Sequence, residues 1–220
     1  MAGQVVVNDQ IIDKPGYNIS KDSNVQIKEI FPYVSRGATK IEKAFVEFDL
    51  DFHDKVICDV GSSTGGFSDF ALQHGAKKII AIDVGRGQLD QKVRNNDKVI
   101  VMEKTDFRKV EKLPVKIDYY LCDVSFISLK KILPHIKELV ANSQQQSTQI
   151  VALIKPQFEA GAKEVSRGKG VIKSEQKRLE IVEEIKIFAQ SQDFKILGLT
   201  ESPITGAKGN KEYLIYLSLY

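Results

Sequence analysis

Short apolar runs recur along most of the chain, and amphipathic segments separate most of them. The runs have the length of buried strands and are rich in β-branched residues. They lie at residues 56–60, 79–83, 98–102, 118–124 and 149–155. Several intervening segments carry apolar residues at helical spacing, most clearly 68–75, 128–142 and 174–192. Strands that alternate with helices predict an α/β fold, in which helices cover both faces of a mostly parallel sheet.

The two ends of this α/β region depart from the alternation. Before the first strand, Ser35 has the character of a helix N-cap. The apolar face of that helix is formed by Ile41, Ala44, Phe45 and Phe48. After the last helix, residues 194–220 contain two apolar runs joined by a loop without a helical pattern. Because no crossover helix joins these runs, we expect the last strand to enter the sheet antiparallel.

Residues 1–30 show a third pattern, with short strand-like runs between turn formers. QVVVN is followed by Asn8 and Asp9, and the alternating run NVQIK comes later. A β-rich piece of this length is too short to bury a core of its own. We therefore expect a small domain at 1–30 and the main domain at 31–220.

The overall composition narrows the class of protein. Hydrophobic residues make up 42% and charged residues 28% of the 220 residues, an ordinary globular mixture. The formal net charge of +3 permits a nucleic-acid partner without requiring one. No apolar run approaches the roughly 18 residues that span a membrane, and the polar start of the chain does not match a signal peptide. We therefore expect a cytoplasmic protein without a membrane partner.

Cysteine and histidine usage gives no sign of a metal site or a disulfide framework. Cys58 and Cys122 both lie in apolar, strand-like runs. His53, His74 and His135 have no partner pattern for a metal or a catalytic triad, so surface positions are expected for them. The sequence therefore predicts no metal, and any chemistry must come from other residues.

A glycine-rich loop, DVGSSTGGFSD at 59–69, follows the first strand of the main domain. Glycines between a buried strand and a helix let backbone amides approach an anionic or polar ligand closely. The spacing differs from the G-x-G-x-x-G of dinucleotide folds, and the Lys-Ser/Thr ending of a P-loop is missing. The remaining candidate is the Asp/Glu-x-Gly-x-x-x-Gly loop that holds the amino-acid part of S-adenosylmethionine. The cofactor contacts expected from this loop are Asp59, Gly61, Ser62, Ser63, Thr64, Gly65, Gly66 and Phe67.

Aspartates mark the ends of successive predicted strands, at Asp59, Asp83, Asp106 and Asp123. One such carboxylate would be weak evidence, because solvated strand ends commonly carry aspartate. Four in succession favour a cofactor site outside the carboxyl ends of the strands. Asp83 is placed to accept the ribose hydroxyls, Asp106 to contact the adenine amino group, and Asp123 to take part in the same site.

Six motifs occur in one order along the chain: YVSRGATKIEKA, DVGSSTGGFSD, AIDVGRGQLD, DVSFISL, VALIKPQFEAG and SPITGAKGNKEYL. They span about residues 33–217, and they resemble the hemolysin A (TlyA) family and, beyond it, the FtsJ-like RNA 2′-O-ribose methyltransferases. The resemblance implies a Rossmann-like, S-adenosylmethionine-dependent methyltransferase fold with a seven-stranded sheet. It also implies S-adenosyl-L-methionine as the cofactor and RNA as the substrate, either ribosomal RNA or ribosomal subunits.

FtsJ-like enzymes use a Lys-Asp-Lys-Glu set, which this chain matches at Lys40, Asp123, Lys155 and Glu212. A ribose hydroxyl is a poor nucleophile, so methyl transfer to it needs in-line alignment and removal of its proton. A neutral lysine can take that proton, and crowding beside a second ammonium and a positive sulfur favours the neutral form. Lys155 is therefore the expected base. Asp123 would orient it, Lys40 would fix the target nucleotide or its phosphate, and Glu212 would complete the hydrogen bonding.

The resemblance also bears on residues 1–30. The family opens with a compact RNA-binding domain like that of a small-subunit ribosomal protein, and this stretch resembles only the β-rich second half of that domain. The two helices expected before it are missing. Residues 1–30 are thus expected to be a partial RNA-binding domain.

A basic segment, residues 163–178, follows the expected base directly. It predicts either a solvated loop or a mobile lid that grips RNA phosphates, and we favour the lid. The expected RNA contacts are Arg36, Lys163, Arg167, Lys169 and Lys173, and Lys177 and Arg178 belong to the same segment. Phe126 and Phe158, beside Asp123 and Lys155, are suited either to stack on a flipped base or to pack in the core.

Three other functions compete with RNA 2′-O-methylation. Base or amine methyltransferases commonly carry an Asn/Asp-Pro-Pro-aromatic loop after the fourth strand, where this chain has DVSF at 123–126. A membrane-lytic role, which the family name raises, lacks a membrane-length run or a long basic amphipathic helix. An RNA-binding or ribosome-assembly factor without catalysis is the third, and the complete lysine, aspartate and glutamate set argues against it.

Overall fold

The computed structural model of the chain describes residues 5–12, 16–27, 31–145, 147–160, 168 and 170–219. The chain forms two compact units, residues 1–33 and 34–220. All the candidate site residues named above belong to the larger unit.

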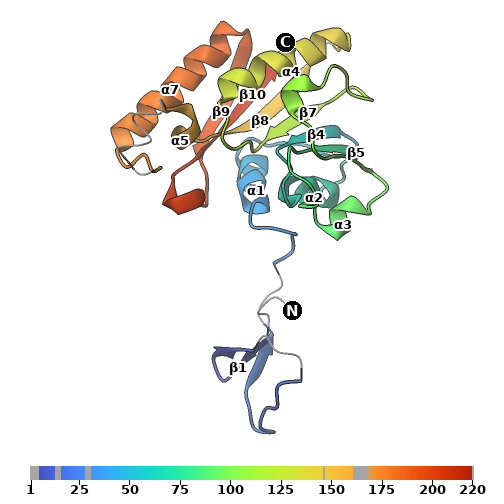
Figure 1. Ribbon diagram of the computed structural model, residues 1–220, viewed down its shortest axis with the longest axis vertical. Helices are drawn as coiled ribbons and strands as arrows, with labels where there is room; N and C mark the ends of the chain where they lie inside the picture. The colour runs from blue at the N-terminus through green and yellow to red at the C-terminus, as the bar shows by residue number, and fades with distance from the viewer. Residues whose placement is uncertain are drawn as a thin grey trace. The chain divides into compact units, whose positions relative to one another are not determined.

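The small unit contains a three-stranded antiparallel sheet. Its central strand β1 (Val5–Val7) pairs with β2 (Gln10–Ile11) and with β3 (Val25–Ile27). Asn8 and Asp9, which join β1 to β2, have positive φ angles of 48° and 64°, a conformation that these two residue types tolerate. The strand-like runs and the turn expected in this stretch are present (Figure 1).

The large unit is built on a seven-stranded sheet with the order β6-β5-β4-β7-β8-β10-β9 (Figure 1). The strands are β4 (Val56–Val60), β5 (Lys78–Ile82), β6 (Val99–Met102), β7 (Tyr119–Cys122), β8 (Thr148–Ile154), β9 (Phe194–Glu201) and β10 (Tyr213–Leu219). Neighbours from β6 to β8 are parallel, and β10 is antiparallel to both β8 and β9. The predicted α/β fold, the seven-stranded sheet and the antiparallel last strand are confirmed.

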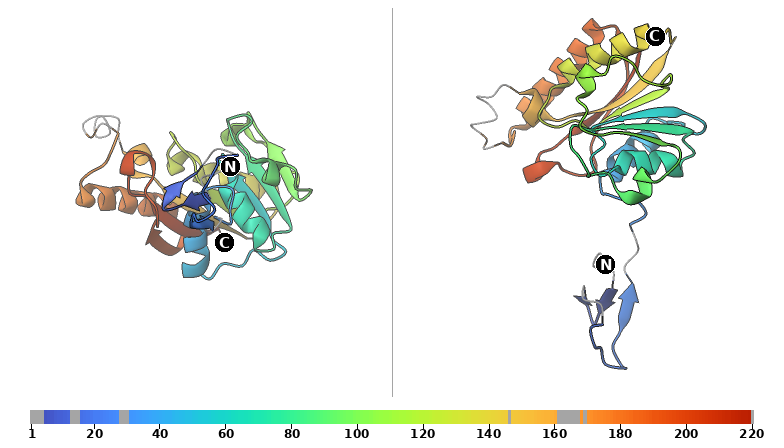
Figure 2. Two further views of the ribbon diagram at one scale, coloured as in Figure 1. Left: turned by 90° about the horizontal axis from the view of Figure 1, so that it is seen from below. Right: turned by 45° about the vertical axis from the view of Figure 1, so that its right-hand side comes forward.

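Helices cover both faces of this sheet (Figure 2). One layer contains α1 (Ala38–Glu47), α2 (Gly66–Gln73) and α3 (Gln91–Arg94), and the other contains α4 (Leu133–Asn142), α5 (Pro156–Glu159) and α7 (Glu175–Ser191). Short 3₁₀ turns are η1 (Phe107–Lys109), η2 (Leu129–Lys131) and η3 (Ala207–Gly209). The two layers bury the strands on both faces, which explains why their apolar runs are nearly continuous.

The start of α1 differs from the prediction. The helix is preceded by Gly37, and no side chain caps its first turn. The carbonyl of Ser35 instead accepts a hydrogen bond of 3.1 Å from the amide of Ala38. The Oγ of Ser35 lies against Gly66, in the space that a side chain there would need. Ser35 as the N-cap is therefore wrong, because this residue forms a turn that packs on the start of α2.

The strand order creates a topological switch point between β4 and β7. From β4 the chain runs outward to β5 and β6, and then returns to β7 and β8 on the other side. In open α/β sheets, ligands bind outside the carboxyl ends of the strands at such a point. Asp59, Gly61, Asp123 and Lys155 lie at or just beyond the carboxyl ends of β4, β7 and β8. The fold therefore gathers the predicted site residues at this edge of the sheet.

Cys58 and Cys122 are free cysteines buried in β4 and β7. Burial raises the pKa of both thiols well above the usual range, so they stay protonated. Their predicted place in apolar strands is confirmed.

The three histidines are only partly where the sequence placed them. His53 is exposed, whereas His74 and His135 are partly buried, so the expected surface position holds only for His53. The ring of His74 stacks on Phe70, with ring centroids 3.9 Å apart. Across the residues that the structure describes, no three His, Cys, Asp or Glu side chains gather in a way that could hold a metal ion.

Candidate active site

Two cavities adjoin at the carboxyl edge of the large sheet. One, of about 490 Å³, is lined by the glycine loop and by Lys40, Lys155 and Glu212. The other, of about 440 Å³, is lined by Asp83 and Asp106. Residues common to both linings are Gly61, Ser63, Asp123, Ser125 and Phe126. The two cavities therefore share part of their walls at the carboxyl ends of β4 and β7.

The glycine loop forms the wall between the strands and this site. Gly61 has a φ of +84°, and a Cβ there would lie 2.8 Å from the carbonyl oxygen of Asp123. Gly65 has a φ of +90°, and a Cβ there would lie 2.7 Å from Leu89. Both positions therefore require glycine. The predicted cofactor residues that line the first cavity are Asp59, Gly61, Ser62, Ser63, Thr64, Gly66 and Phe67.

Asp59 presents an unpartnered carboxylate oxygen at this loop. The residue is 1% exposed, and its Oδ2 accepts hydrogen bonds from the amide and the Oγ of Ser68 at 3.1 and 2.6 Å. Its Oδ1 is buried and has no partner in the described part of the chain. Burial raises the pKa of Asp59 to about 7, although the Ser68 hydrogen bonds oppose the shift. A buried acceptor of this kind fits the ammonium group of an amino-acid ligand.

Asp83 is arranged for hydroxyl recognition. Its Oδ2 accepts a hydrogen bond of 2.9 Å from the amide of Ser63, and its Oδ1 accepts one of 2.7 Å from the amide of Gly85. Each carboxylate oxygen can accept a second hydrogen bond. Asp83 thus stabilises the glycine loop and keeps capacity for the two hydroxyls of a ribose.

Asp106 is engaged by a neighbour that the sequence reasoning did not consider. Arg108 holds it in a bidentate pair, with Nε 2.9 Å from Oδ1 and Nη2 2.6 Å from Oδ2. The hydrogen bonds from Arg108 hold the pKa of Asp106 below its usual range. Asp106 lines the second cavity, but a contact with the adenine amino group would have to share its oxygens with Arg108.

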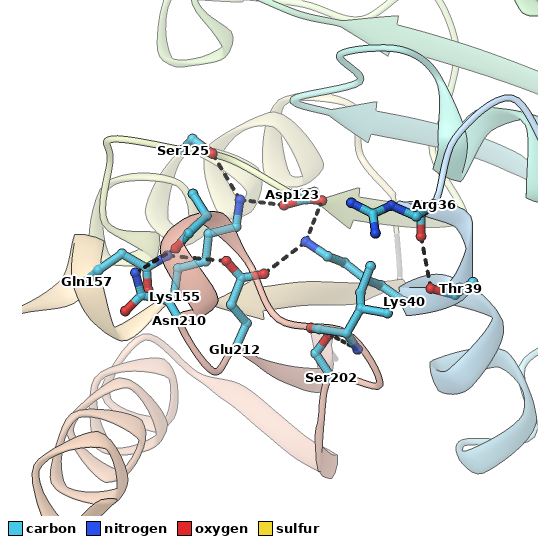
Figure 3. Close-up of polar contacts among 12 residues, drawn as sticks. Arg36, Thr39, Lys40, Asp123, Ser125, Lys155, Gln157, Ser202, Asn210 and Glu212 are labelled. Carbon is cyan, nitrogen blue, oxygen red and sulfur yellow. Dashed lines mark hydrogen bonds and ion pairs between the residues drawn. The ribbon is translucent and has the colours of Figure 1, made fainter. Parts of the chain in front are cut away.

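The four candidate catalytic residues form one network of charges, in which Lys40, Lys155 and Glu212 are buried and Asp123 is partly buried (Figure 3). Nζ of Lys40 lies 3.2 Å from Oδ2 of Asp123 and 2.9 Å from Oε2 of Glu212. Nζ of Lys155 lies 2.5 Å from Oδ1 of Asp123 and 3.0 Å from Oγ of Ser125. These residues come from α1, from the carboxyl ends of β7 and β8, and from the residue before β10. The fold brings together all four residues that the sequence had picked out.

The charges in this network balance, which is what permits their burial. Burial by itself would lower the pKa of Lys40, but attraction to Asp123 and Glu212 outweighs it and raises that pKa. Burial would likewise raise the pKa of Asp123, but Lys155 and Lys40 outweigh it and lower that pKa. Lys40 is therefore a permanent ammonium and Asp123 a permanent carboxylate near neutral pH. Lys155 pairs with the same carboxylate as Lys40, through its other oxygen.

Three residues near the network were missed by sequence reasoning. Oγ of Ser125 accepts a hydrogen bond of 3.0 Å from Nζ of Lys155, and Nε2 of Gln157 donates one of 3.2 Å to Oε1 of Glu212. Glu159 accepts hydrogen bonds from the Oγ of Ser128 and from the amide of Leu129. Each missed residue lies within four positions of Asp123 or Lys155, in DVSF or KPQFE. That proximity was the available signal for all three residues.

The mouth of the site carries the predicted nucleotide contacts. Phe126 is 90% exposed, with a φ of 62°, and its ring centroid lies 4.8 Å from that of Phe158. Packing in the core is therefore wrong for Phe126. Arg36 is exposed and lines the first cavity, and Figure 3 shows its side chain turned toward Asp123 and Lys40.

The basic segment is described only in part. Lys163, Arg167 and Lys169 lie outside the described residues, and Lys173 is exposed. Arg178 is 9% exposed, and its Nη1 donates to the carbonyl oxygens of Ile172 and Lys173 at 3.0 and 2.8 Å. The prediction that Arg178 helps to bind RNA phosphates is wrong, because its guanidinium is buried and donates hydrogen bonds to backbone carbonyl oxygens.

A glycine cradle, an unpaired carboxylate oxygen and a buried lysine pair at one switch point suit a ligand that carries both an ammonium group and a transferable carbon. The protein is an S-adenosylmethionine-dependent methyltransferase. Residues 33–219 match the family model described as FtsJ-like methyltransferase, and the chain belongs to this family.

Relatives support the same assignment. The chain is 41% identical over 224 residues to "Putative rRNA methyltransferase YqxC" of Bacillus subtilis, covering 99% of this chain and 77% of that protein. It is 37% identical over 187 residues to the 16S/23S rRNA (cytidine-2′-O)-methyltransferase TlyA of Mycobacterium tuberculosis, covering 84% and 68%. A solved structure titled "Putative hemolysin from Streptococcus thermophilus" is similar with a TM-score of 0.82 and 40% identity, covering 100% and 80%. No helix in the described ranges is both long and apolar enough to cross a membrane.

Proposed function

We propose that the protein methylates the 2′-hydroxyl of a nucleotide in ribosomal RNA. The observation that carries the proposal is the buried Lys40–Asp123–Lys155–Glu212 network beside the cofactor cavity. Relatives named for rRNA methylation supply the RNA class, and one of them is named for cytidine, so we propose cytidine as the target. An enzyme with this substrate works where ribosomes are, which is the cytoplasm.

The cofactor would be held by the residues that line the joined cavities. Asp59 is placed for the ammonium group, Asp83 for the ribose hydroxyls, and the glycine loop for close backbone contact. When bound, S-adenosylmethionine supplies an electrophilic methyl group on a positive sulfur. The chain's own task is then to align a ribose hydroxyl with that methyl group and to remove the hydroxyl proton.

Lys155 takes the proton as the 2′-oxygen forms its bond to carbon. In the ion pair with Asp123 it is an ammonium, so it must lose a proton before each turnover. The positive charge of a bound cofactor would add to those of Lys40 and Lys155, and this would favour the neutral amine at Lys155. Asp123 and Ser125 keep the amine pointed at the hydroxyl, and Lys40 holds Asp123 and Glu212 in place.

The target nucleotide would enter from the exposed side. Phe126 is suited to stack on an extruded base, because its ring is exposed beside Phe158 at the cavity mouth. Arg36 and Lys173 are exposed cations suited to the RNA phosphates. The small β-rich unit, residues 1–33, is proposed as part of an RNA-binding domain.

The test is direct. The protein is incubated with radiolabelled S-adenosylmethionine and purified ribosomal subunits, and 2′-O-methylated positions are mapped by their resistance to alkaline cleavage. We expect label at a small number of cytidines. Label on a base, or on protein alone, would contradict the proposal, and dye release from liposomes without RNA labelling would favour the lytic alternative.

A further inference from the structure

Gln157 is a buried polar residue in the active-site cavity to which the mechanism above gives no role. It lies in α5, two positions after Lys155, and it is 6% exposed. Its Nε2 donates to Oε1 of Glu212 at 3.2 Å. Its Oε1 is also buried, and none of the residues that the structure describes provides a hydrogen-bond partner for it.

The contact with Glu212 fixes the orientation of the amide. Glu212 is 2% exposed, and its other oxygen is paired with Lys40 at 2.9 Å. An ionised carboxylate only accepts hydrogen bonds, so the amide nitrogen must face it. Gly206 packs against the same carboxylate, because a Cβ there would overlap Oε1 of Glu212. Glu212 is thus held on both oxygens, and the amide oxygen of Gln157 is left for another group.

An unpaired buried acceptor needs an explanation, since nearly all buried polar groups in native proteins are hydrogen-bonded. Gln157 lines the same cavity as Lys155, Phe126 and Phe158. Under the proposed function, the part of this cavity beside Asp59 and the glycine loop holds the cofactor, and the part beside Lys155 and Phe126 receives the target nucleotide. A group of that nucleotide is therefore the natural partner of the free oxygen.

The partner must be a hydrogen-bond donor, and an internal RNA nucleotide has few donors. Its phosphate oxygens and the ring oxygen of its sugar only accept. The 2′-hydroxyl can donate, and so can the N–H groups of the base, such as the 4-amino group of cytosine. A free amide oxygen is matched by one of these two kinds of donor.

We propose that Gln157 recognises the target nucleotide, with its Oε1 accepting a hydrogen bond from a donor of that nucleotide while its Nε2 keeps Glu212 aligned with Lys40. The proposal rests on the proposed function, because it takes RNA as the substrate. It makes Gln157 a specificity residue through one end of its amide and a positioning residue through the other.

The recognition is tested by binding, so that turnover is not required. A short RNA spanning the mapped nucleotide is made in three forms: unmodified, with the base amino group replaced by hydrogen, and with a 2′-deoxyribose. Affinities are measured with S-adenosylhomocysteine present for the parent, for Gln157→Leu, and for the control Gln190→Leu at an exposed position of α7.

The parent and the control should bind one of the two altered RNAs about 5- to 30-fold more weakly than the unmodified RNA, the effect of one lost hydrogen bond. Gln157→Leu should bind that altered RNA and the unmodified RNA within about 2-fold of each other, because leucine has no acceptor that the altered RNA would leave unpaired. Which altered RNA shows the effect identifies the donor as the base or the hydroxyl. An equal loss in the parent and in Gln157→Leu would overturn the proposal. If the difference between the parent and Gln157→Leu is present but the methyl group of the mapped nucleotide is found on its base and not on its 2′-oxygen, the proposed function fails and the recognition by Gln157 stands.

The positioning role is tested without RNA. In Gln157→Glu, a second carboxyl group faces Glu212, and it can donate a hydrogen bond only while protonated. Its melting temperature should therefore fall relative to that of the parent as the pH rises from 5 to 8. Gln190→Glu should show no such trend. A difference from the parent that stays constant with pH would contradict the contact between Gln157 and Glu212.

Discussion

Asp59, which is buried, and Asp123, which is partly buried, lie at the same edge of the sheet, and their surroundings shift their pKa values in opposite directions. Ammonium groups of Lys40 and Lys155 contact Asp123, and its pKa is lowered. Asp59 has only the neutral Ser68, and burial raises its pKa to about 7. One aspartate is therefore a permanent anion, whereas the other titrates near neutral pH.

Replacing Asp59 by Asn should stabilise the protein at alkaline pH. The pKa of Asp59 is raised from 3.8 to about 7 on folding, so the folded state binds this proton more tightly than the unfolded chain. The parent therefore loses stability as the pH rises from about 4 to about 7, by up to about 4 kcal/mol. Asp59→Asn has no ionisable group at this position, so it does not lose this stability as the pH rises. Urea unfolding of both proteins at pH 5 and pH 8 should show the advantage of Asp59→Asn growing with pH.

The matched control is Asp97→Asn, at an exposed position in the same unit. Its stability relative to the parent should not change between the two pH values. A difference between Asp59→Asn and the parent that is equal at pH 5 and pH 8 would show that Asp59 is ionised in both conditions. Calorimetry should also show weaker binding of S-adenosylhomocysteine to Asp59→Asn, since the variant presents no carboxylate to the ammonium group.

At the scale of elements, α5 and the loop after β7 behave as one support for the site. Glu159 receives hydrogen bonds from Ser128 and Leu129, and burial raises its pKa. The rings of Phe158, in α5, and Phe126, in the loop after β7, are also in contact. The alignment of the loop with Lys155 therefore depends on α5, a helix of a single turn.

Glu159→Ala should weaken the contact between α5 and the loop after β7. It leaves the buried amide of Leu129 without a partner, which costs about 1–3 kcal/mol. Because Asp123 and Ser125 lie on the loop that moves, kcat should fall at least several-fold, while affinity for S-adenosylhomocysteine stays near that of the parent. Denaturant unfolding and steady-state kinetics measure the two effects. Glu138→Ala, on the exposed side of α4, is the control, and equal behaviour of both variants would refute the coupling.

At the scale of the whole molecule, the chain divides into units 1–33 and 34–220, and RNA binding is proposed for the first of them. Every described residue of the cofactor and catalytic cavities belongs to the second unit. A chain that begins at residue 31 should therefore fold and bind S-adenosylhomocysteine with nearly unchanged affinity. Its affinity for ribosomal RNA should fall at least about 10-fold, with a flatter dependence on salt, because phosphate contacts are lost. Unchanged RNA affinity would show that the small unit has no part in RNA binding.

The sequence predicted most of this architecture because the strands of the large unit are buried on both faces, so that their apolar runs are nearly continuous. It failed where the hydrogen-bond partners of a side chain cannot be read from the neighbouring sequence. Arg178 looked like a surface cation, since its carbonyl partners are apparent only in the folded chain. Gln157 was passed over because Glu212 lies 55 positions away. Lys40 is 83 and 172 positions from its partners, so only the family resemblance could single it out.

The central claim is that Lys155 removes the proton from the ribose hydroxyl, and single-turnover methyl transfer measured across pH tests it most directly. Three variants accompany the parent: Lys155→Ala, Lys155→Arg and, as the matched control, Lys195→Arg at an exposed position of β9. Binding of S-adenosylhomocysteine first establishes that each variant is folded.

The rate of the parent and of Lys195→Arg should rise with pH, because the proposed mechanism needs a neutral amine as the general base. Lys155→Ala should be slower by about 10² to 10⁴-fold, the typical effect of losing a general base. Lys155→Arg should be nearly as slow at every pH, because a guanidinium keeps its charge and accepts no proton. Near-parent rates for Lys155→Arg would contradict the account and make Lys155 an electrostatic anchor, with the proton passing to solvent.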